Sequence, residues 1–216
     1  PELNLLARGS QVAIPTTASV IDLGVKVDAT LTPSSQCLRA AAKARSQLFL
    51  LRRRFVDISP NNFKVVRPHL EYCVQAWSLY LVRDINHLER VQRQATRMVR
   101  SIRHLPYAAR LARLNLFSLK RRRLRGDLIE TFKIVKQIDR VDPDYFFTRS
   151  HTTELRGHPY KLYKPRFQTR GRQFTFSTRV INPWNLLPTS VVNSNNVLEF
   201  KTKLDQVWAA TFPHFM

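Results

Sequence analysis

The stretch VRPHLEYCVQAWSLYLVRDINHLERVQRQATRMVRSIR runs from Val66 to Arg103 and carries the strongest structural signal in the chain. In its second half, apolar residues recur at helical spacing on one side and arginines recur on the other. The apolar side consists of Ile85, Leu88, Val91, Ala95, Met98, Val99 and Ile102. The basic side consists of Arg90, Arg93, Arg97 and Arg100. This pattern predicts an amphipathic helix over residues 84–103, with one face in a core and the other facing an anionic partner.

Positive charge is concentrated around this stretch. The 216 residues include 36 Lys and Arg against 15 Asp and Glu, which gives a formal net charge of +21. Between Arg39 and Lys136 the basic residues outnumber the acidic ones by 23 to 6. Such an imbalance indicates a polyanionic partner such as RNA or DNA. The hydrophobic fraction of 44% is still sufficient for one large core or two small ones.

Upstream of the stretch, the pattern predicts a strand followed by a helix. Residues 19–28 alternate between apolar and polar side chains, which is typical of a half-buried strand. Thr32 is a suitable N-cap and Pro33 a suitable first helical residue. The apolar stripe of the following helix consists of Cys37, Ala41, Ala44, Leu48, Leu51 and Phe55. Three arginines, Arg52 to Arg54, stand at its end, where cations suit the helix dipole.

Further helices are predicted downstream. After Pro68, which interrupts a helix at Arg67, a new apolar stripe consists of Leu70, Cys73, Val74, Trp77 and Leu81. A shorter helix begins at Pro106. The next one is marked by Leu124, Leu128, Phe132 and Val135 and is entered through Lys120, Arg121, Arg122 and Arg123. Such a basic run is either a solvated surface or a contact for nucleic acid, and the two interpretations have equal weight for this cluster alone.

The C-terminal part interleaves cations with aromatic rings. Its cations include Arg166, Arg170 and Arg172, and its rings include Tyr160, Tyr163, Phe167, Phe174 and Phe176. Single-stranded nucleic acid is bound by this combination through phosphate pairing and base stacking. The alternative is that the rings fill a small core, and both interpretations stay open. The polar, turn-rich residues 141–153 separate this part from the helices before it.

The predicted fold class is mainly α. A helical, thumb-like bundle is preceded by a short β-strand or hairpin and followed by a small mixed, mostly helical C-terminal domain. The expected divisions are 1–31 for a connecting segment with a strand near 19–28, 32–140 for the basic helical domain, 141–153 for a linker and 154–216 for the C-terminal domain.

The quoted stretch closely resembles the thumb of reverse transcriptases from non-LTR (LINE-type) retrotransposons. The resemblance is carried by VRPHLEYCVQAWS over residues 66–78 and by LERVQR over residues 88–93. It continues in the expected order through RRLRGDLI at 122–129, RGH at 156–158, Trp184 with Asn185, Leu187 and Pro188, and Phe200 with Lys201, Leu204, Asp205 and Trp208. Upstream, residues 22–25 match the strand that leads from palm to thumb. One departure is a shortened segment between Phe63 and Val66, which would rotate the helix that follows it.

The resemblance implies a nucleic-acid-binding part of an RNA-directed DNA polymerase. RNA, DNA or an RNA/DNA hybrid would be held along its backbone without reading of sequence. The palm and fingers of the same polymerase would be the other partners. The residues expected to bind are Arg90, Arg93, Arg97, Arg100, Lys120, Arg121, Arg122, Arg123, Arg166, Arg170 and Arg172.

Catalysis is not expected of this chain by itself. Polymerisation needs palm carboxylates that hold two magnesium ions, and no two acidic residues are adjacent anywhere in the sequence. Asp142 and Asp144 flank Pro143 and are interpreted as a turn. No catalytic residue and no cofactor is therefore predicted for the chain, and magnesium would belong to the complete polymerase. The chain is expected to be a non-catalytic C-terminal fragment.

Other classes of site and location are disfavoured. His69 and Cys73 have a spacing that suits half a zinc site, but no second pair completes four ligands. Neither a membrane span of about 20 apolar residues nor a signal peptide is recognisable, so an intracellular, nuclear location without membrane contact is expected. Two alternative functions remain. One is a domesticated basic helical protein that serves as a nucleic-acid or protein interaction module, and the other is an inert relic.

Overall fold

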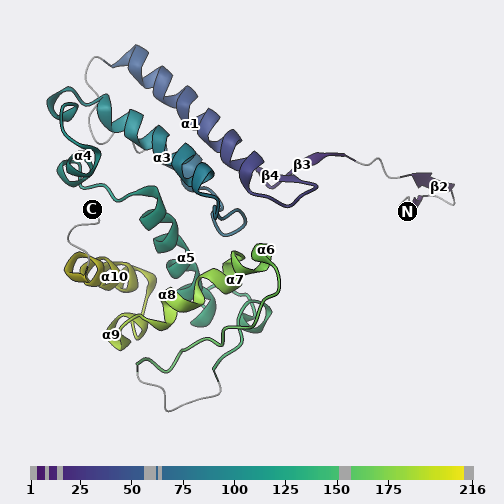
Figure 1. The fold of residues 1–216 in the computed structure, drawn as a ribbon. Helices are drawn as coiled ribbons and strands as arrows, with labels where there is room; N and C mark the ends of the chain where they lie inside the picture. The colour runs from purple at the N-terminus through teal and green to yellow at the C-terminus, as the bar shows by residue number, and fades with distance from the viewer. Residues whose placement is uncertain are drawn as a thin grey trace.

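The structure is a computed structural model that describes residues 4–7, 10–13, 17–55, 62, 65–150 and 157–211. It is mainly helical with short antiparallel hairpins at its N-terminal side, so the predicted fold class is confirmed. In Figure 1 two long helices, α1 (Ser34–Arg54) and α3 (Val82–Arg97), lie side by side. A second group of helices gathers around α5 (Leu119–Val135) and α10 (Val197–Thr211).

The N-terminal strands form two hairpins. Strand β1 (Asn4–Ala7) pairs with β2 (Ser10–Ala13), and β3 (Ser19–Asp22) pairs with β4 (Val25–Asp28). The single strand predicted over residues 19–28 is therefore folded in two. The reason is the turn at Leu23 and Gly24, whose φ angles of 42° and 84° are both positive. Glycine adopts such angles without a steric penalty, and this conformation at both turn residues matches the twist of a hairpin.

Helices α1 and α3 run parallel, and their N-terminal ends are joined by hydrogen bonds. The Ser34 hydroxyl donates to the carboxylate of Asp84 at 2.6 Å, and the Cys37 thiol donates to the Asp84 carbonyl at 3.4 Å. Between the helices lies the first core, in which Ala41, Ala44, Leu88 and Val91 are buried. Small residues on α1 allow the two backbones to approach closely. As a result the C-terminal ends of both helices lie together at the far side of the first core.

Two predicted helices end earlier than expected. Helix α2 (Arg67–Glu71) does not continue to Leu81, because residues 72–77 form turns in which Cys73 has a φ of 51°. These turns leave Cys73 exposed and bury Val74 and Trp77. The indole N–H of Trp77 donates to the carbonyl of Tyr72 at 2.7 Å and closes the loop. Of the shortened segment before α2, Phe63 and Lys64 lie outside the described residues.

The amphipathic helix predicted over residues 84–103 ends at Arg97. Val99 is extended, with φ −78° and ψ 107°, and the chain then turns into the short 3-10 helix η2 (Arg100–Ile102). This break lets Met98, Val99 and Ile102 all pack against the first core. The predicted arginine stripe is therefore divided between two elements. The next helix, α4 (Tyr107–Arg113), follows Pro106 as predicted.

Helix α5 belongs to both cores. Leu119 at its start packs in the first core, while Leu128 and Phe132 pack in the second, where the Phe132 ring stacks on that of Phe200 at 4.3 Å between centroids. Four further helices contribute buried residues to the second core, namely α7 (Phe176–Arg179), α8 (Ile181–Asn185), α9 (Thr189–Val192) and α10. The short helix α6 (Arg170–Gln173) precedes them. Within the segment predicted as a linker, Pro143–Tyr145 form the 3-10 helix η3 and Phe147 is buried in the second core.

A buried ion pair connects α7 to α5 and to the loop after α2. Arg179, at the end of α7, forms two hydrogen bonds of 2.9 and 2.8 Å with the carboxylate of Asp127 on α5. The same guanidinium donates to the carbonyl of Val74 at 3.1 Å, in the loop after α2. The side chains of Arg179 and Asp127 are only 13% and 5% exposed. Arg179 therefore fixes the C-terminal helices against the first half of the molecule.

A buried histidine contributes to the second core. The Nε2–H group of His158 donates to the carbonyl of Trp184 at 3.0 Å, and its buried Nδ1 atom has no hydrogen-bond partner among the described residues. Burial lowers the pKa of His158, and the charge of Lys161 adds to this effect. The neutral ring is therefore the form that the folded protein accommodates.

We expect the folded protein to lose stability on mild acidification because of this histidine. When the pKa of a histidine is lower in the folded state, its contribution is complete above the unfolded pKa of about 6.5 and declines as the pH falls below that value. His158→Gln keeps an N–H donor for Trp184 but does not titrate, so it should flatten the decline. Urea unfolding between about pH 7.5 and 5.5 measures the effect. The exposed His104, changed to Gln, is the control, and equal curves for both variants would contradict the assignment.

Candidate nucleic-acid interface

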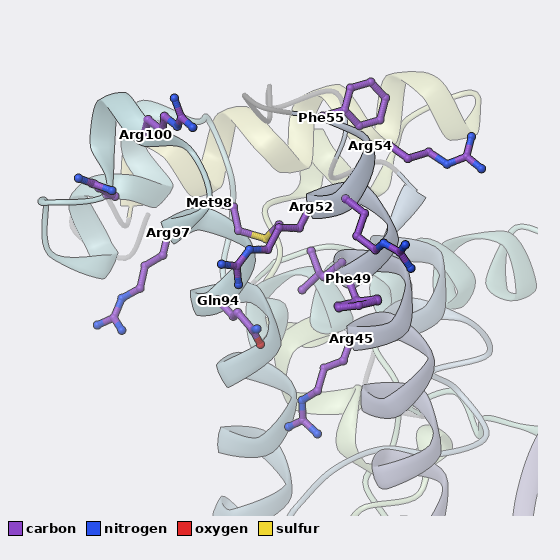
Figure 2. Close-up of a pocket in the computed structure, with 12 residues that line it drawn as sticks. Arg45, Phe49, Arg52, Arg54, Phe55, Gln94, Arg97, Met98 and Arg100 are labelled. Carbon is purple, nitrogen blue, oxygen red and sulfur yellow. The ribbon is translucent and has the colours of Figure 1, made fainter.

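A groove lies between the C-terminal ends of α1 and α3. Its volume is about 610 Å³, and Figure 2 shows side chains of both helices reaching into and around it. Seven of its lining residues are exposed arginines, namely Arg45, Arg52, Arg53, Arg54, Arg97, Arg100 and Arg103. Among the described residues that line it, none is Asp or Glu. The groove is thus a strongly positive concavity.

The helix dipoles favour some of the cations at the groove but do not balance their mutual repulsion. Two helices end at the groove, and a helix C-terminus favours nearby cations by about 0.3 to 1 kcal/mol each at exposed positions. Arg52, Arg53 and Arg54 occupy the last turn of α1, and Arg97 occupies the last turn of α3. This attraction is modest beside the repulsion among seven guanidinium groups. An anion in the groove would relieve that repulsion and accept charge-assisted hydrogen bonds.

The field of these arginines acts on a neighbouring histidine. His87 lies 3.2 Å from a guanidinium nitrogen of Arg45, measured from its Nε2 atom. Burial is the largest cause that lowers the pKa of His87, followed by the charges of Arg45 and Arg90. A neutral His87 accepts the hydrogen bond from Arg45, which orients this arginine at the edge of the groove.

The groove also contains apolar surface. Leu48 is buried at its base and Met98 is half-buried. Two phenylalanine rings are exposed at its wall, Phe49 by 59% and Phe55 by 46%. The guanidinium of Arg53 lies 5.7 Å from the centroid of the Phe49 ring. Arginines and aromatic rings therefore occur together at the C-terminal end of α1.

The predicted stripe of α3 contributes only part of the groove. Arg97 and Arg100 line it, whereas Arg90 and Arg93 are exposed on α3 outside it. Arg93 instead lies over the Tyr107 ring, with 5.1 Å between its guanidinium carbon and the ring centroid. The stripe is divided because α3 ends at Arg97 and turns.

Most of the predicted basic cluster at the start of α5 is not on the surface in the way the arginines of α3 are. Lys120 is exposed, but the three arginines after it are engaged within the protein. Arg121 lies between the rings of Phe117 and Trp208, at 4.3 and 5.0 Å from their centroids. Arg122 pairs with the carboxylate of Glu71 on α2 through two hydrogen bonds.

Arg123 is the most deeply placed of the cluster. It is only 9% exposed and donates to the carbonyls of Leu70 and Trp77, the second at 2.5 Å. Its guanidinium lies 4.2 Å from the centroid of the Trp77 ring, and burial lowers its pKa to about 10. Of the predicted cluster, Lys120 is exposed and the three arginines are engaged within the fold, and binding of nucleic acid by the cluster stays a prediction. The three arginines brace α5 against α2, the loop after it and α10.

The predicted cations of the C-terminal part lie elsewhere. Arg166 and Arg172 are exposed, and neither lines the groove. Arg172 lies in α6, which Arg170 begins. The side chain of Arg170 lies outside the described residues. Two of the eleven predicted residues, Arg97 and Arg100, therefore line the groove, together with five arginines that were not predicted.

The sequence gives only a partial indication that the five added arginines belong to a binding site. The run of Arg52, Arg53 and Arg54 is visible at the end of a predicted helix, where the helix dipole already accounts for it. Arg45 precedes Arg52 on the same helix, and Arg103 follows the break after α3. What reveals them as one site is the parallel packing of α1 and α3, which no local pattern indicates.

Comparison of the chain with protein-family models, curated proteins and solved structures finds no match. Within the described residues, no group of three or more His, Cys, Asp and Glu side chains is placed to hold a metal ion. In the same part of the chain, no helix combines the length and apolar character that crossing a membrane requires.

Proposed function

We propose that the chain binds RNA, DNA or an RNA/DNA hybrid through the arginine groove between α1 and α3. The observation that carries the proposal is the convergence of seven exposed arginines without a carboxylate among the described lining residues. Phosphate groups are the natural ligands for planar guanidinium forks. These arginines would bind the nucleic-acid backbone, because contacts to phosphates hold a strand without reading its sequence.

The positions of four carboxylates outside the groove also support this proposal. Glu71, Asp127 and Asp205 each form bidentate pairs with an arginine of the fold. Glu89 accepts from the Tyr107 hydroxyl at 2.5 Å and from the backbone of Leu119 at 3.2 Å. Since these carboxylates are engaged internally, they do not neutralise the groove.

The resemblance to non-LTR retrotransposon reverse transcriptases supplies the biological setting of the proposal. In that setting the chain is the thumb and C-terminal part of an RNA-directed DNA polymerase. It would hold the primer and template while the palm and fingers carry out the chemistry with magnesium. The proposed role of this chain is binding, and no catalytic residue is assigned to it.

Removing groove charge should weaken the salt dependence of binding. The triple variant with Arg52, Arg54 and Arg97 changed to Gln should reduce the slope of log affinity against log salt concentration by about 2 to 3, because each phosphate contact contributes about 0.7 to 0.9. Fluorescence anisotropy with a labelled RNA/DNA hybrid over a series of salt concentrations measures this slope. Arg53 is kept, because it lies over Phe49.

The control removes the same charge elsewhere. Lys43, Arg113 and Arg140 are exposed and lie outside the groove, and their change to Gln should alter the slope much less. Equal effects of the two triples would mean that only the net charge matters. A folded wild-type chain that ignores hybrid, DNA and RNA in dilute buffer would refute the proposed function.

A further inference from the structure

We infer that the arginine groove takes unpaired, single-stranded nucleic acid, whose bases stack on Phe49 and Phe55. The inference rests on the proposed function and specifies its ligand. Phosphate contacts alone do not reveal whether the ligand is a duplex or a single strand, because both offer phosphate groups to the arginines.

The exposed rings carry the inference. Phe49 and Phe55 are 59% and 46% exposed, although the first core lies next to the groove and buries Leu48 on the same helix. Phe49 follows Leu48 directly, so the helix turns its ring out of the α1–α3 contact and toward the groove wall. Exposed rings of this size leave apolar surface in water. An unpaired base that stacks on them would cover that surface.

A duplex would make little use of these rings. In a duplex the faces of the bases are already stacked on one another, and only phosphates, sugars and base edges are accessible. Single-strand-binding proteins instead combine a basic path for the backbone with aromatic platforms for the bases. Phe49 on α1 and Phe55 directly after its end stand among Arg45, Arg52 and Arg54, which is this combination (Figure 2).

The arginines next to the rings add to the platform. The guanidinium of Arg53 lies 5.7 Å from the centroid of the Phe49 ring, so a base at this site has both a ring and a planar cation within reach. The groove volume of about 610 Å³ falls in the range of about 300 to 1,000 Å³ that holds compact organic ligands. An unpaired nucleotide is a ligand of this size.

The test compares single and double strands with substitutions of the rings. The probes are a labelled oligo-dT of about 12 nucleotides, a length within the usual site sizes of single-strand-binding domains, and the same strand annealed to oligo-dA. Phe49→Leu and Phe55→Leu keep apolar bulk but remove the aromatic face. Each should weaken single-strand binding by roughly 5-fold to 150-fold, as expected for the loss of one stacked base. Duplex affinity and the salt slope should not change.

Matched variants keep the outcome interpretable. Phe49→Trp retains a platform and should restore single-strand affinity, whereas Leu38, exposed on the same helix by 54% but outside the groove, should tolerate Ala without effect. Both rings are exposed, so circular dichroism melts should match those of the wild type.

Several results would overturn the inference. These are equal weakening of both probes by the Leu variants, no weakening of either, or displacement of oligo-dT by a poly-glutamate peptide of equal charge as efficiently as by unlabelled oligo-dT. In the first two cases the proposed function stands as long as the wild-type chain binds in a salt-dependent way. Failure of the wild-type chain to bind any probe would refute the proposed function itself.

Discussion

Arg179→Ala is expected to lower the free energy of unfolding by about 3 to 5 kcal/mol, which is the usual effect of removing one partner of a buried ion pair. The variant leaves the carboxylate of Asp127 buried and without the two hydrogen bonds that Arg179 provides. It also removes the donor to the Val74 carbonyl, which connects α7 to the loop after α2. Urea unfolding monitored by circular dichroism measures the loss.

The pH dependence of this variant offers a second readout. Burial raises the pKa of Asp127, while Arg179 opposes the shift. Without Arg179 the pKa should rise further, and a carboxylate whose folded pKa lies above its unfolded value regains stability as the pH falls toward the unfolded value. The deficit of Arg179→Ala relative to wild type should therefore shrink in acid.

Two comparisons test the reason for the effect. Arg172→Ala, which removes an exposed arginine of α6, should change stability by no more than about 0.5 kcal/mol. A double change of Asp127 to Leu and Arg179 to Met should be less harmful than Arg179→Ala, since neither member of this pair is then left as a buried charge without its partner. A loss below about 1 kcal/mol for Arg179→Ala would show that the pair behaves like a surface ion pair.

Trp77→Ala should destabilise the protein by about 3 to 5 kcal/mol, in the range for truncation of a large buried aromatic residue. Trp77 is 3% exposed, and its ring covers the guanidinium of Arg123 at 4.2 Å from the centroid. Its removal leaves a cavity in the first core and leaves the buried Arg123 without its aromatic partner. The indole hydrogen bond to the Tyr72 carbonyl is lost as well.

Thermal and urea unfolding measure this loss of stability. Two milder variants serve as comparisons. Trp77→Phe keeps most of the packing and should lose less. Tyr72→Phe, in the same loop, removes only the hydroxyl that donates to the Leu23 carbonyl at 2.8 Å, which is worth about 0.5 to 1.5 kcal/mol. Similar losses for Trp77→Ala and Tyr72→Phe would contradict a role for Trp77 in the core.

Trp77 and Asp127, the ion-pair partner of Arg179, both lie in segments that suggested the family resemblance. In the quoted stretch, Glu71 pairs with Arg122, the Tyr72 hydroxyl reaches the β3–β4 turn and Trp77 covers Arg123. These three residues therefore stabilise the fold of this chain. The groove arginines of α1 lie outside that stretch.

Several features of the fold could be predicted from local pattern. The stripe of Leu88, Val91 and Ala95 fixes the buried face of α3, because period 3.6 is a property of one helix by itself. The helix ends and the hairpin were predicted less well. Val99 leaves the helical conformation so that Met98 and Ile102 reach the core, and this choice depends on a surface that other segments provide.

The sequence by itself determined the helical class, the amphipathic character of α3 and an excess of positive charge too large to be neutralised internally. The tertiary structure alone decided which arginines serve the fold and which form the groove. Arg122, Arg179 and Arg125 find their carboxylates 51, 52 and 80 residues away in the chain. The arginines of α1 and α3 meet only because the two helices pack in parallel. Charge acts through distance in space, so a run of basic letters does not reveal its partner until the chain is folded.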